Sequence, residues 1–323
     1  MSITHPELPP EALRSLDWSL LGSSSRWQNK PFTTHATVAE LAYIDTLGYS
    51  KHYWLPHQSG AVLLSWKPLP WDSDFFGLPM GQIQLLSTMK QTELCSTCRL
   101  LLSSLLHNND IRHWHLEINA THWSLLNELL HLGFRLMDTK LTFINSHPLS
   151  HSRKSPMMSH TRPYRATDYP AILQIVQQST IESRFQRDPL LRPQSSALYA
   201  AWIQRLLAPQ TTPLGISTAN PAVIYEKNHQ IIAIGLLEAF ILPESLNQLR
   251  YYANGLVLAI PGSQGVYYPL IHQLHQQISD TPYLFCEIRI SQTHLQAYRV
   301  LERFSRLKAV HHSLHWYAGP VSD

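Results

Sequence analysis

The chain repeats one succession of secondary-structure patterns in its two halves, and this repeat limits the fold more than any other feature of the sequence. In each half, hydrophobic patterns of helical period alternate with patterns of period two. The order is helix, strand, helix, strand: 91–107, 113–119, 121–132 and 136–144 in the first half, and 267–278, 283–290, 293–304 and 309–318 in the second. Further strand patterns precede each set. Strands that alternate both with helices and with hairpins form a mixed sheet with helices on its faces. We therefore expect an α/β chain of two tandem domains, each a mixed, mostly antiparallel sheet flanked by helices.

The boundary between the halves is the segment SHPLSHSRKSPMMSHTRP at 146–163. It is rich in Ser, His and Pro and has no hydrophobic period, which is typical of a linker. We place an N-terminal domain at 1–147, a linker at 148–160 and a C-terminal domain at 161–323.

Individual residues predict where several of the expected helices and turns begin or end. Thr121 is an expected N-cap, and Gly133 an expected C-cap, for the helix at 121–132. Asn228-His229 separates two strand patterns and predicts a hairpin turn. Thr167 and Asp168 predict the start of a helix, and 36–48 predicts an early one.

Composition excludes several classes of function. The 25 basic and 22 acidic residues nearly balance, and no Lys/Arg cluster predicts a nucleic-acid partner. No stretch approaches the roughly 20 apolar residues of a membrane span, and the start lacks a secretory pattern, so we expect a cytoplasmic protein without a membrane partner. Three cysteines form no disulfide framework, and Cys95 and Cys98 lie in a helical pattern that predicts a helix face.

Histidine is abundant, with 19 in the chain, so metal-ligand spacing has to be tested. Three groups stand out, but the sequence places no acidic or Cys partner with any of them, and there is no HExxH motif. We therefore expect no metal. The groups are His113 and His115, His272 and His275, and His311, His312 and His315.

The segment 254–277, NGLVLAIPGSQGVYYPLIHQLHQQ, predicts a strand, a short glycine-containing turn and a helix. The first turn of a helix has unpaired N–H groups and the positive end of the helix dipole. Small residues let an anion approach those groups, and a diphosphate suits them. An ordinary surface loop explains the same residues.

Several motifs, in order, resemble the GNAT superfamily of acyl-CoA-dependent N-acyltransferases. More narrowly, they resemble the two-domain group around TDP-fucosamine (TDP-4-amino-4,6-dideoxygalactose) acetyltransferase. The motifs span about 250 residues: LPWDSDFFGLPMGQI at 69–83, LLHLGFRLMDT at 129–139, RPYRATDYPAILQIV at 162–176, SRFQRDPLLRPQSSALYAAWIQRLL at 183–207 and THLQAYRVLERFSRLKAVHHSLHWY at 293–317.

The resemblance implies a fold and a mechanism. Two parallel strands, at 254–260 and 283–290, would splay apart and hold the pantetheine arm of acetyl-CoA, or another acyl-CoA, as co-substrate. The turn would cradle the pyrophosphate, and an amine would attack the thioester directly. The implied cofactor-binding residues are Leu258, Ala259, Ile260, Gly262, Ser263, Gln264, Gly265, Val266 and Tyr267.

The sequence departs from the family pattern at two chemical positions. The central glycine of the pyrophosphate loop is kept as Gly265, but its last small residue is replaced by Tyr267. The family's general-acid Tyr aligns with Leu301. Tyr298, one turn earlier, is the substitute acid, although a buried aromatic explains it equally.

Other polar residues supply candidate roles. Glu238 is a candidate base on the strand at 230–241. Glu287 and Arg289 share one face of their strand, as substrate contacts or as a simple ion pair. Arg184, Phe185 and Asp188 are candidate substrate contacts, with an Arg184–Asp188 ion pair as the alternative.

In the first half, Trp71, Phe75 and Phe76 are expected to fix a core or the domain contact. This half has no glycine-rich loop, and we interpret it as a scaffold. The sequence thus predicts an N-acetyltransferase acting on a small primary amine, with a nucleotide-linked amino sugar as the implied acceptor. The alternative is a degenerate relative that binds CoA, a metabolite or a protein without turnover. A homodimer is left open.

Overall fold

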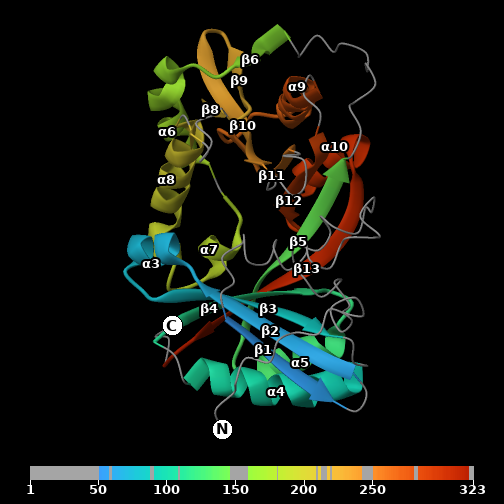
Figure 1. Ribbon diagram of the computed structural model, residues 1–323. Helices are drawn as coiled ribbons and strands as arrows, with labels where there is room; N and C mark the ends of the chain where they lie inside the picture. Colours follow the sequence, from blue (N-terminus) through green and yellow to red (C-terminus); the bar gives the residue numbers. More distant parts are fainter. Residues whose placement is uncertain are drawn as a thin grey trace. The chain divides into compact units, whose positions relative to one another are not determined.

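A computed structural model describes residues 51–57, 60–87, 91–107, 110–145, 159–179, 181–208, 210–211, 217–218, 220–241, 250–279 and 283–319 (Figure 1). The helix predicted at 36–48 and nearly all of the predicted linker lie outside these ranges. The chain divides into two compact units. Unit 1 is Met1–Lys140, Arg187–Leu191 and Ala309–Asp323, and unit 2 is Leu141–Gln186 and Arg192–Lys308.

The elements follow the predicted order. Up to residue 145 they are β1 (Lys51–His57), β2 (Gly60–Pro68), α3 (Pro70–Phe76), β3 (Met80–Ser87), α4 (Gln91–His107), β4 (His113–Asn119), α5 (Trp123–His131) and β5 (Arg135–Asn145). From 161 to 227 they are β6 (Thr161–Pro163), η4 (Ala166–Asp168), α6 (Tyr169–Gln178), α7 (Arg184–Arg187), η5 (Arg192–Gln194), α8 (Ser195–Leu207), β7 (Gln210–Thr211), β8 (Ser217–Thr218) and β9 (Ala222–Lys227). The remainder are β10 (Gln230–Ile241), β11 (Arg250–Ala259), α9 (Tyr267–Ser279), β12 (Tyr283–Ser291), α10 (Leu295–Phe304) and β13 (Arg306–Tyr317).

Each unit has a mixed, mostly antiparallel sheet, as predicted. In unit 1 the strand order is β1-β2-β3-β4-β13, and the β3–β4 pair is parallel while the others are antiparallel. In unit 2 the order is β12-β11-β10-β9-β6, and the β11–β12 pair is the parallel one. In both units, antiparallel pairs therefore lead into a parallel pair with a helix between its strands.

The division of the chain differs from the predicted one at its C-terminal strand. Residues of β13 from Ala309 onward belong to unit 1, where His315 pairs with His115 and Tyr317 with His113 of β4. The sequence assigned this strand to the second domain. Pairing between strand residues 198 positions apart leaves no local signal in the sequence, because the alternation within one strand does not show which other strand it pairs with.

Turn and cap predictions were mostly confirmed. Asn228 and His229 have φ of 52° and 61°, as a type I′ hairpin turn requires. Gly133 has φ of 89°, the left-handed conformation expected just after a helix. Thr121 is not the N-cap of α5, which is His122. The Thr121 backbone N–H and hydroxyl instead donate to the Asn119 side chain, because this polar group lies closer than the helix start.

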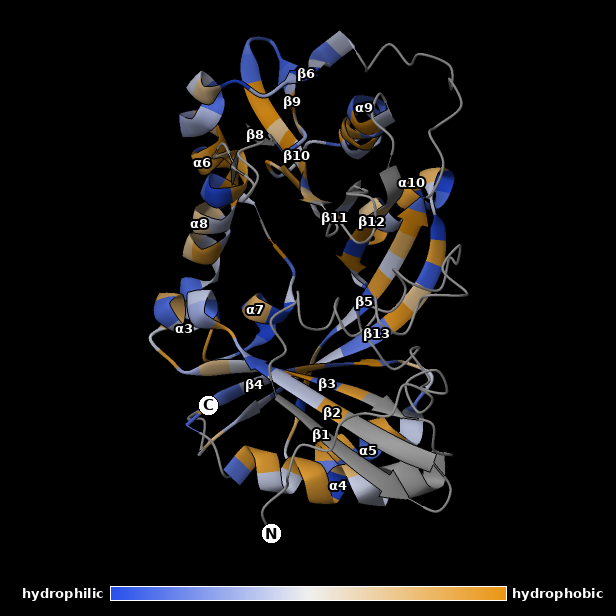
Figure 2. Ribbon diagram, in the orientation of Figure 1, coloured by the Kyte–Doolittle hydropathy of each residue, from blue (hydrophilic) through white to orange (hydrophobic). Residues whose placement is uncertain are grey.

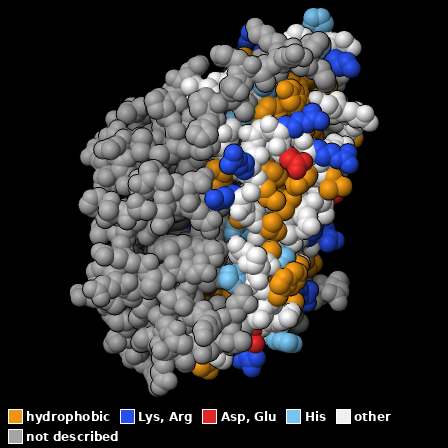
Figure 3. All heavy atoms as spheres, turned by 90° about the vertical axis from the view of Figure 1, so that its right-hand side faces the viewer, with side chains coloured by type: hydrophobic (Ala, Val, Ile, Leu, Met, Phe, Trp, Pro, Cys, Tyr) orange, Lys and Arg blue, Asp and Glu red, His pale blue; other side chains and the backbone are white. Residues whose placement is uncertain are grey.

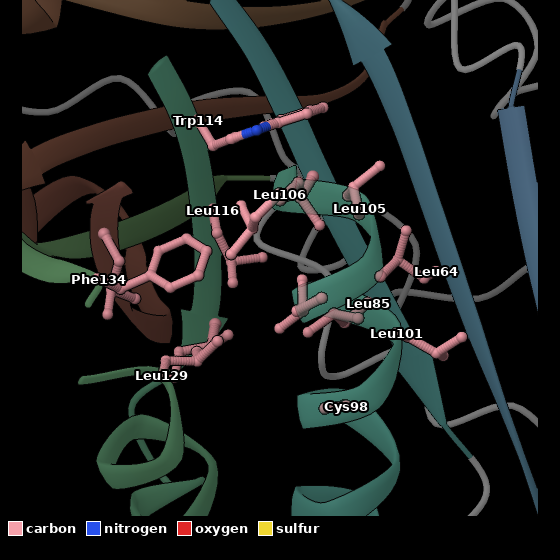
Figure 4. Close-up of a cluster of buried hydrophobic side chains, with 14 of the residues drawn as sticks. Leu64, Leu85, Cys98, Leu101, Leu105, Leu106, Trp114, Leu116, Leu129 and Phe134 are labelled. Atoms are coloured by element: carbon pink, nitrogen blue, oxygen red, sulfur yellow. The ribbon is translucent and has the colours of Figure 1, made fainter. Parts of the chain in front are cut away.

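The core of unit 1 lies between its sheet and two helices (Figure 4). Leu101, Leu105 and Leu106 of α4 belong to one cluster with Trp114 and Leu116 of β4, and all five are buried. Cys98 is buried in the same cluster, which confirms the helix-face interpretation for that cysteine. Arg99 and Glu128 form a two-bond ion pair between α4 and α5.

The aromatic motif of the first half forms a helix that the sequence did not reveal. Trp71, Phe75 and Phe76 lie on α3 and are half-buried, and their rings contact one another. Of the two predicted roles, fixing a core is wrong, because α3 has no buried residue, and fixing the domain contact stays a prediction. Ser73 instead ties the helix to β3, accepting a hydrogen bond from Met80 N at 2.9 Å.

Helices cover both faces of the unit 2 sheet, with α6 and α8 on one side of β9 and β10 and α9 on the other (Figure 1). Ile234 and Leu236 of β10 join the cluster formed by α6 and α8. Gly235, between them, faces α9, where an added Cβ would lie 3.0 Å from Leu274. Since both faces are covered, β9 and β10 are hydrophobic along most of their length (Figure 2).

None of the described helices is long and apolar enough to cross a membrane. On the face shown in Figure 3, basic side chains are scattered among hydrophobic and uncharged ones.

Candidate functional site

The two parallel strands of unit 2 separate before they end. Among the described residues, the pairing of β11 with β12 stops at Tyr252↔Cys286, although β11 continues to Ala259 and β12 to Ser291. The register of β11 against β10 shifts at the same place, since Leu236 pairs with Leu256 but Glu238 with Ala253. The extra residue in β11 is a bulge, and a bulge bends its strand and increases its twist. The bend gives a physical reason for the divergence.

The diverging edge of β11 is only partly covered. Ile288 of β12 approaches Gly255, where an added Cβ would lie 3.3 Å from its side chain. Beyond this contact, Val257, Ala259 and Ile260 are half-buried.

Backbone direction along this edge follows from one hydrogen bond. Ile260 N donates to Ile232 O of the segment paired with β11, so the backbone groups of Ile260 point toward β10. Backbone groups alternate in direction along a strand, and those of Val257 and Ala259 therefore point away from β10. Ser179 confirms this direction, because its hydroxyl donates to Ala259 O at 3.0 Å.

The turn after β11 has the backbone shape that glycine favours. Gly262 has φ of 83° and Gly265 φ of 79°. A Cβ added at Gly262 would meet nothing within 4 Å, and both glycines and Gln264 are exposed. Val266 is buried and precedes α9, which starts at Tyr267. The turn thus presents exposed small residues at the start of a 13-residue helix, the setting predicted for a phosphate group.

Tyr267 and His294 connect the starts of the two helices that follow the diverging strands. The Tyr267 hydroxyl lies 3.1 Å from His294 Nε2, and the two rings meet edge to face. Burial raises the pKa of Tyr267 and lowers the pKa of His294, while the nearby Glu182 partly opposes the second shift. A neutral imidazole and a protonated phenol are therefore the forms that this pair favours near neutral pH.

Glu182 adds a second link at this end of the sheet. Its carboxylate accepts a hydrogen bond from the Thr293 hydroxyl, which also lies 2.9 Å from the Ser291 hydroxyl. The segment before α7 is thereby tied to the end of β12.

The predicted charged residues lie close to the divergence. Glu287 is fully buried, one residue past the last paired residue of β12, and Arg289 is half-buried two residues further. Glu238 is half-buried and pairs with Ala253 at the bulge.

Phe185 lies over the sheet face that carries Ile234 and Leu236, since it packs against the same cluster. By the period of two, Glu238 continues this face of β10. The Arg184 guanidinium lies 4.5 Å from the Phe185 ring centroid. These three predicted residues are therefore compatible with one acceptor site.

Tyr298 makes its contacts elsewhere. Its hydroxyl donates to Glu302 at 3.4 Å in an exposed position, and its ring contacts Phe143 of β5. Leu301, the position that the motif resemblance aligned with a general-acid Tyr, is buried. These contacts favour a packing role for Tyr298.

Asp188 belongs to unit 1, whereas the other predicted substrate contacts belong to unit 2. Its carboxylate accepts hydrogen bonds from His113 at 2.9 Å and from His315. Burial alone would raise the pKa of Asp188, but these hydrogen bonds outweigh burial and hold the pKa well below its usual range. The prediction that His113 and His315 have no acidic partner is wrong, since Asp188 lies 75 residues from His113 and only the fold joins them.

Three residues of this region were missed by sequence reasoning: Ser179, Glu182 and Thr293. Serine at a helix end is too common to signal a contact with a strand. His294 was noted only as a departure from the family pattern, and its pairing with Tyr267 could not be inferred from spacing.

With this geometry in place, the fold can be compared with known structures. A GCN5-related N-acetyltransferase from Sphaerobacter thermophilus matches with a TM-score of 0.52 and 12% identity, over 88% of this chain and 87% of that one. The glucosamine N-acetyltransferase region of a fungal multi-domain GH3 β-N-acetylglucosaminidase matches with a TM-score of 0.51 and 11% identity, over 84% of this chain and 34% of that one. The chain has the α/β fold of the GCN5-related N-acetyltransferases. No protein-family model and no curated protein matches its sequence.

Proposed function

We propose that the protein is an acyl-CoA-dependent N-acyltransferase that uses acetyl-CoA, or another acyl-CoA, to acylate a primary amine of a small molecule in the cytoplasm. One observation carries the proposal. The β11–β12 pairing ends at Tyr252↔Cys286, and the free edge of β11 leads into a turn with two left-handed glycines at the start of α9. An exposed strand edge suits the amides of a pantetheine arm, and the turn suits a diphosphate.

The reaction proposed is a direct transfer within one complex. The amine nitrogen forms a bond to the acyl carbon while the carbon–sulfur bond breaks. One proton leaves the amine and another reaches the departing thiolate. Holding the two reactants in line supplies several kcal/mol of the rate enhancement.

Different residues are proposed for binding the acyl-CoA, for proton transfer and for binding the amine. Val257 and Ala259 offer backbone groups on the free edge, and Gly262 to Tyr267 offer the anion site. Glu238 and Glu287 are candidate bases, and Arg184, Phe185 and Arg289 are candidate acceptor contacts. Tyr298 is the acid proposed from the sequence. Its hydroxyl contacts Glu302, and this contact does not favour an acid role. The narrower acceptor, a nucleotide-linked amino sugar, rests on the motif resemblance alone.

The test is binding followed by turnover. Acetyl-CoA at 100 times its dissociation constant should stabilise the folded chain by about 2.7 kcal/mol, measured by thermal unfolding. A panel of amines, nucleotide-linked 4-amino sugars included, should then release free CoA thiol. Absence of any stabilisation at millimolar acetyl-CoA would contradict the proposal.

A second candidate is favoured by Leu301 and Tyr298. A buried leucine replaces the family's acid, and the neighbouring tyrosine is occupied with Glu302. A relative that binds an acyl-CoA or a metabolite without turnover would show the same thermal stabilisation but no thiol release with any amine.

A further inference from the structure

Unit 1 buries a polar face that the proposed transfer reaction does not use. His113, His115 and Glu117 of β4 pair opposite Tyr317, His315 and Ser313 of β13. Because side chains alternate across a strand, these six residues share one face of the two-stranded ladder. All six are buried. The opposite face carries Trp114, Leu116 and Leu314, which belong to the hydrophobic core.

Two imidazoles on this face meet one carboxylate. His113 and His315 are diagonal neighbours across the ladder, with ring centroids 4.7 Å apart. Asp188 approaches from the segment Arg187–Leu191, which belongs to the same unit. Its Oδ2 lies 2.9 Å from His113 Nε2 and also contacts His315 Nδ1. His113 and Asp188 are 0% exposed and His315 is 1% exposed.

The carboxylate is held in place by its other oxygen. Asp188 Oδ1 accepts hydrogen bonds from Leu190 N at 2.9 Å and from Leu191 N at 3.3 Å. Oδ2 is therefore directed at the two imidazoles by the backbone. Carboxylates that bind metal ions are likewise held in orientation by hydrogen bonds from the surrounding protein.

The charge of the buried carboxylate also suits a cation. Burying an ionised carboxylate is costly unless positive charge or hydrogen bonds compensate for it. Both imidazoles turn one ring nitrogen to the same carboxylate oxygen, so three ligand atoms converge where a cation would be compensated by the Asp188 charge.

We propose that His113 Nε2, His315 Nδ1 and Asp188 Oδ2 bind a divalent first-row transition-metal ion of the Zn(II) type in unit 1. These ligand atoms all lie within 4.8 Å of one another. Four-coordinate zinc with bonds of about 2.0–2.2 Å places its ligand atoms roughly 3.3–3.6 Å apart, so small side-chain shifts suffice. Water or the phenol of Tyr317, whose ring lies 5.1 Å from that of His113, completes the coordination. Two imidazoles and a carboxylate suit Zn(II), Fe(II) or Co(II) better than Mg²⁺ or Ca²⁺.

The test measures metal content, which does not depend on acyl transfer. The full chain, with any affinity tag removed, is stripped with a chelator and titrated with Zn(II), and bound metal is counted by elemental analysis. We expect about one tightly held equivalent per chain, a higher unfolding temperature, and visible d–d bands typical of four- or five-coordinate Co(II) when Co(II) is used instead.

Variants distinguish Zn(II) binding at this site from Zn(II) binding by the other histidines. Asp188→Asn and His315→Gln should weaken Zn(II) binding at least roughly tenfold. His275→Gln, which removes a buried histidine in unit 2, should leave it unchanged. If a variant does not fold, the coordination seen in the wild-type Co(II) spectrum still decides the matter. Equal Zn(II) binding by wild type and Asp188→Asn, or a wild-type spectrum of purely six-coordinate Co(II), would overturn the proposal.

Discussion

The parallel strand pairs of the two units differ in what lies beyond their last paired residues. In unit 1 the described pairing of β3 with β4 ends at Ile83↔Leu116, and in unit 2 the pairing of β11 with β12 ends at Tyr252↔Cys286. Gln84 and Leu85 of β3 are then buried. Ala253 of β11 is buried as well, but Val257 and Ala259, further along that strand, are half-buried. The described end of β3 is thus buried, whereas β11 becomes partly accessible toward its end.

The segments that follow these strands differ in the same sense. β3 is followed by Thr88-Met89-Lys90, without glycine, whereas β11 is followed by a turn with two left-handed glycines. A strand edge that no longer pairs is useful for binding only if it is accessible and its exit loop accepts a ligand. Among the described residues, the unit 2 strand and turn meet both conditions, and four substitutions can test whether the two units differ.

The largest expected effect falls on unit 1. A Cβ added at Gly81 of β3 would lie 2.5 Å from the ring of Trp114, which is fully buried. Gly81→Ala should lower the free energy of unfolding by about 3 kcal/mol, measured by urea denaturation, because the ring cannot move freely. Acetyl-CoA affinity should not change. Gly235→Ala in unit 2 is the control, since its Cβ would lie 3.0 Å from the flexible end of Leu274 and 3.4 Å from Leu270 Cβ, and should cost about 1 kcal/mol. Equal costs for both variants would contradict the difference.

A pH effect on stability is expected from a buried histidine of unit 2. Burial, aided by nearby His272, lowers the pKa of His275 to about 4. An unfolded histidine titrates near 6.5, so this stability contribution is complete above that pH and is lost as pH falls toward 4. Between pH 7.5 and 5, wild type should lose roughly 2 kcal/mol more than His275→Leu. Hydrogen exchange should locate the weakening in α9, and identical pH profiles for the two proteins would disprove it.

The glycine turn allows a matched comparison of ligand binding. Gly262 in unit 2 and Gly77 in unit 1 both have positive φ, and at both an added Cβ meets nothing within 4 Å. Gly262→Ala and Gly77→Ala should each cost about 1 kcal/mol of stability from backbone strain. Only Gly262→Ala should weaken acetyl-CoA binding, by about fivefold in calorimetric titration. An equal affinity in both variants would remove the turn from the proposed binding site.

The smallest effect concerns the free edge of β11. Ser179→Ala removes the hydroxyl that donates to Ala259 O, and acetyl-CoA affinity should rise by about twofold because the carbonyl becomes available. Stability should fall by less than 1 kcal/mol. Ser279→Ala is the control, since Ser279 likewise donates to the carbonyl four residues earlier but not to β11. Weaker acetyl-CoA binding in Ser179→Ala alone would show that the hydroxyl itself serves the ligand.

The sequence predicted the helices and strands better than it predicted which distant segments contact one another. Hydrophobic period and turn residues placed α4, the Asn228-His229 hairpin and the end of α5 at Gly133, because these depend on neighbours within a few residues. The position of β13 beside β4, and the meeting of His113, Asp188 and His315, depend on contacts between distant segments.

For the candidate site, the turn and the diverging strands followed from a local pattern and a family resemblance. The bulge at Asn254–Gly255 and the Tyr267–His294 contact did not, since both arise from tertiary packing.

The pairing of β4 with β13 also has a consequence for synthesis on the ribosome. β4 emerges long before residues 309–317, so its hydrogen-bonding edge stays without this partner while the intervening segment is translated. An unpaired edge of this kind invites association with other nascent chains. Chaperone engagement during that interval would therefore be concentrated on the earlier-made half of the polypeptide.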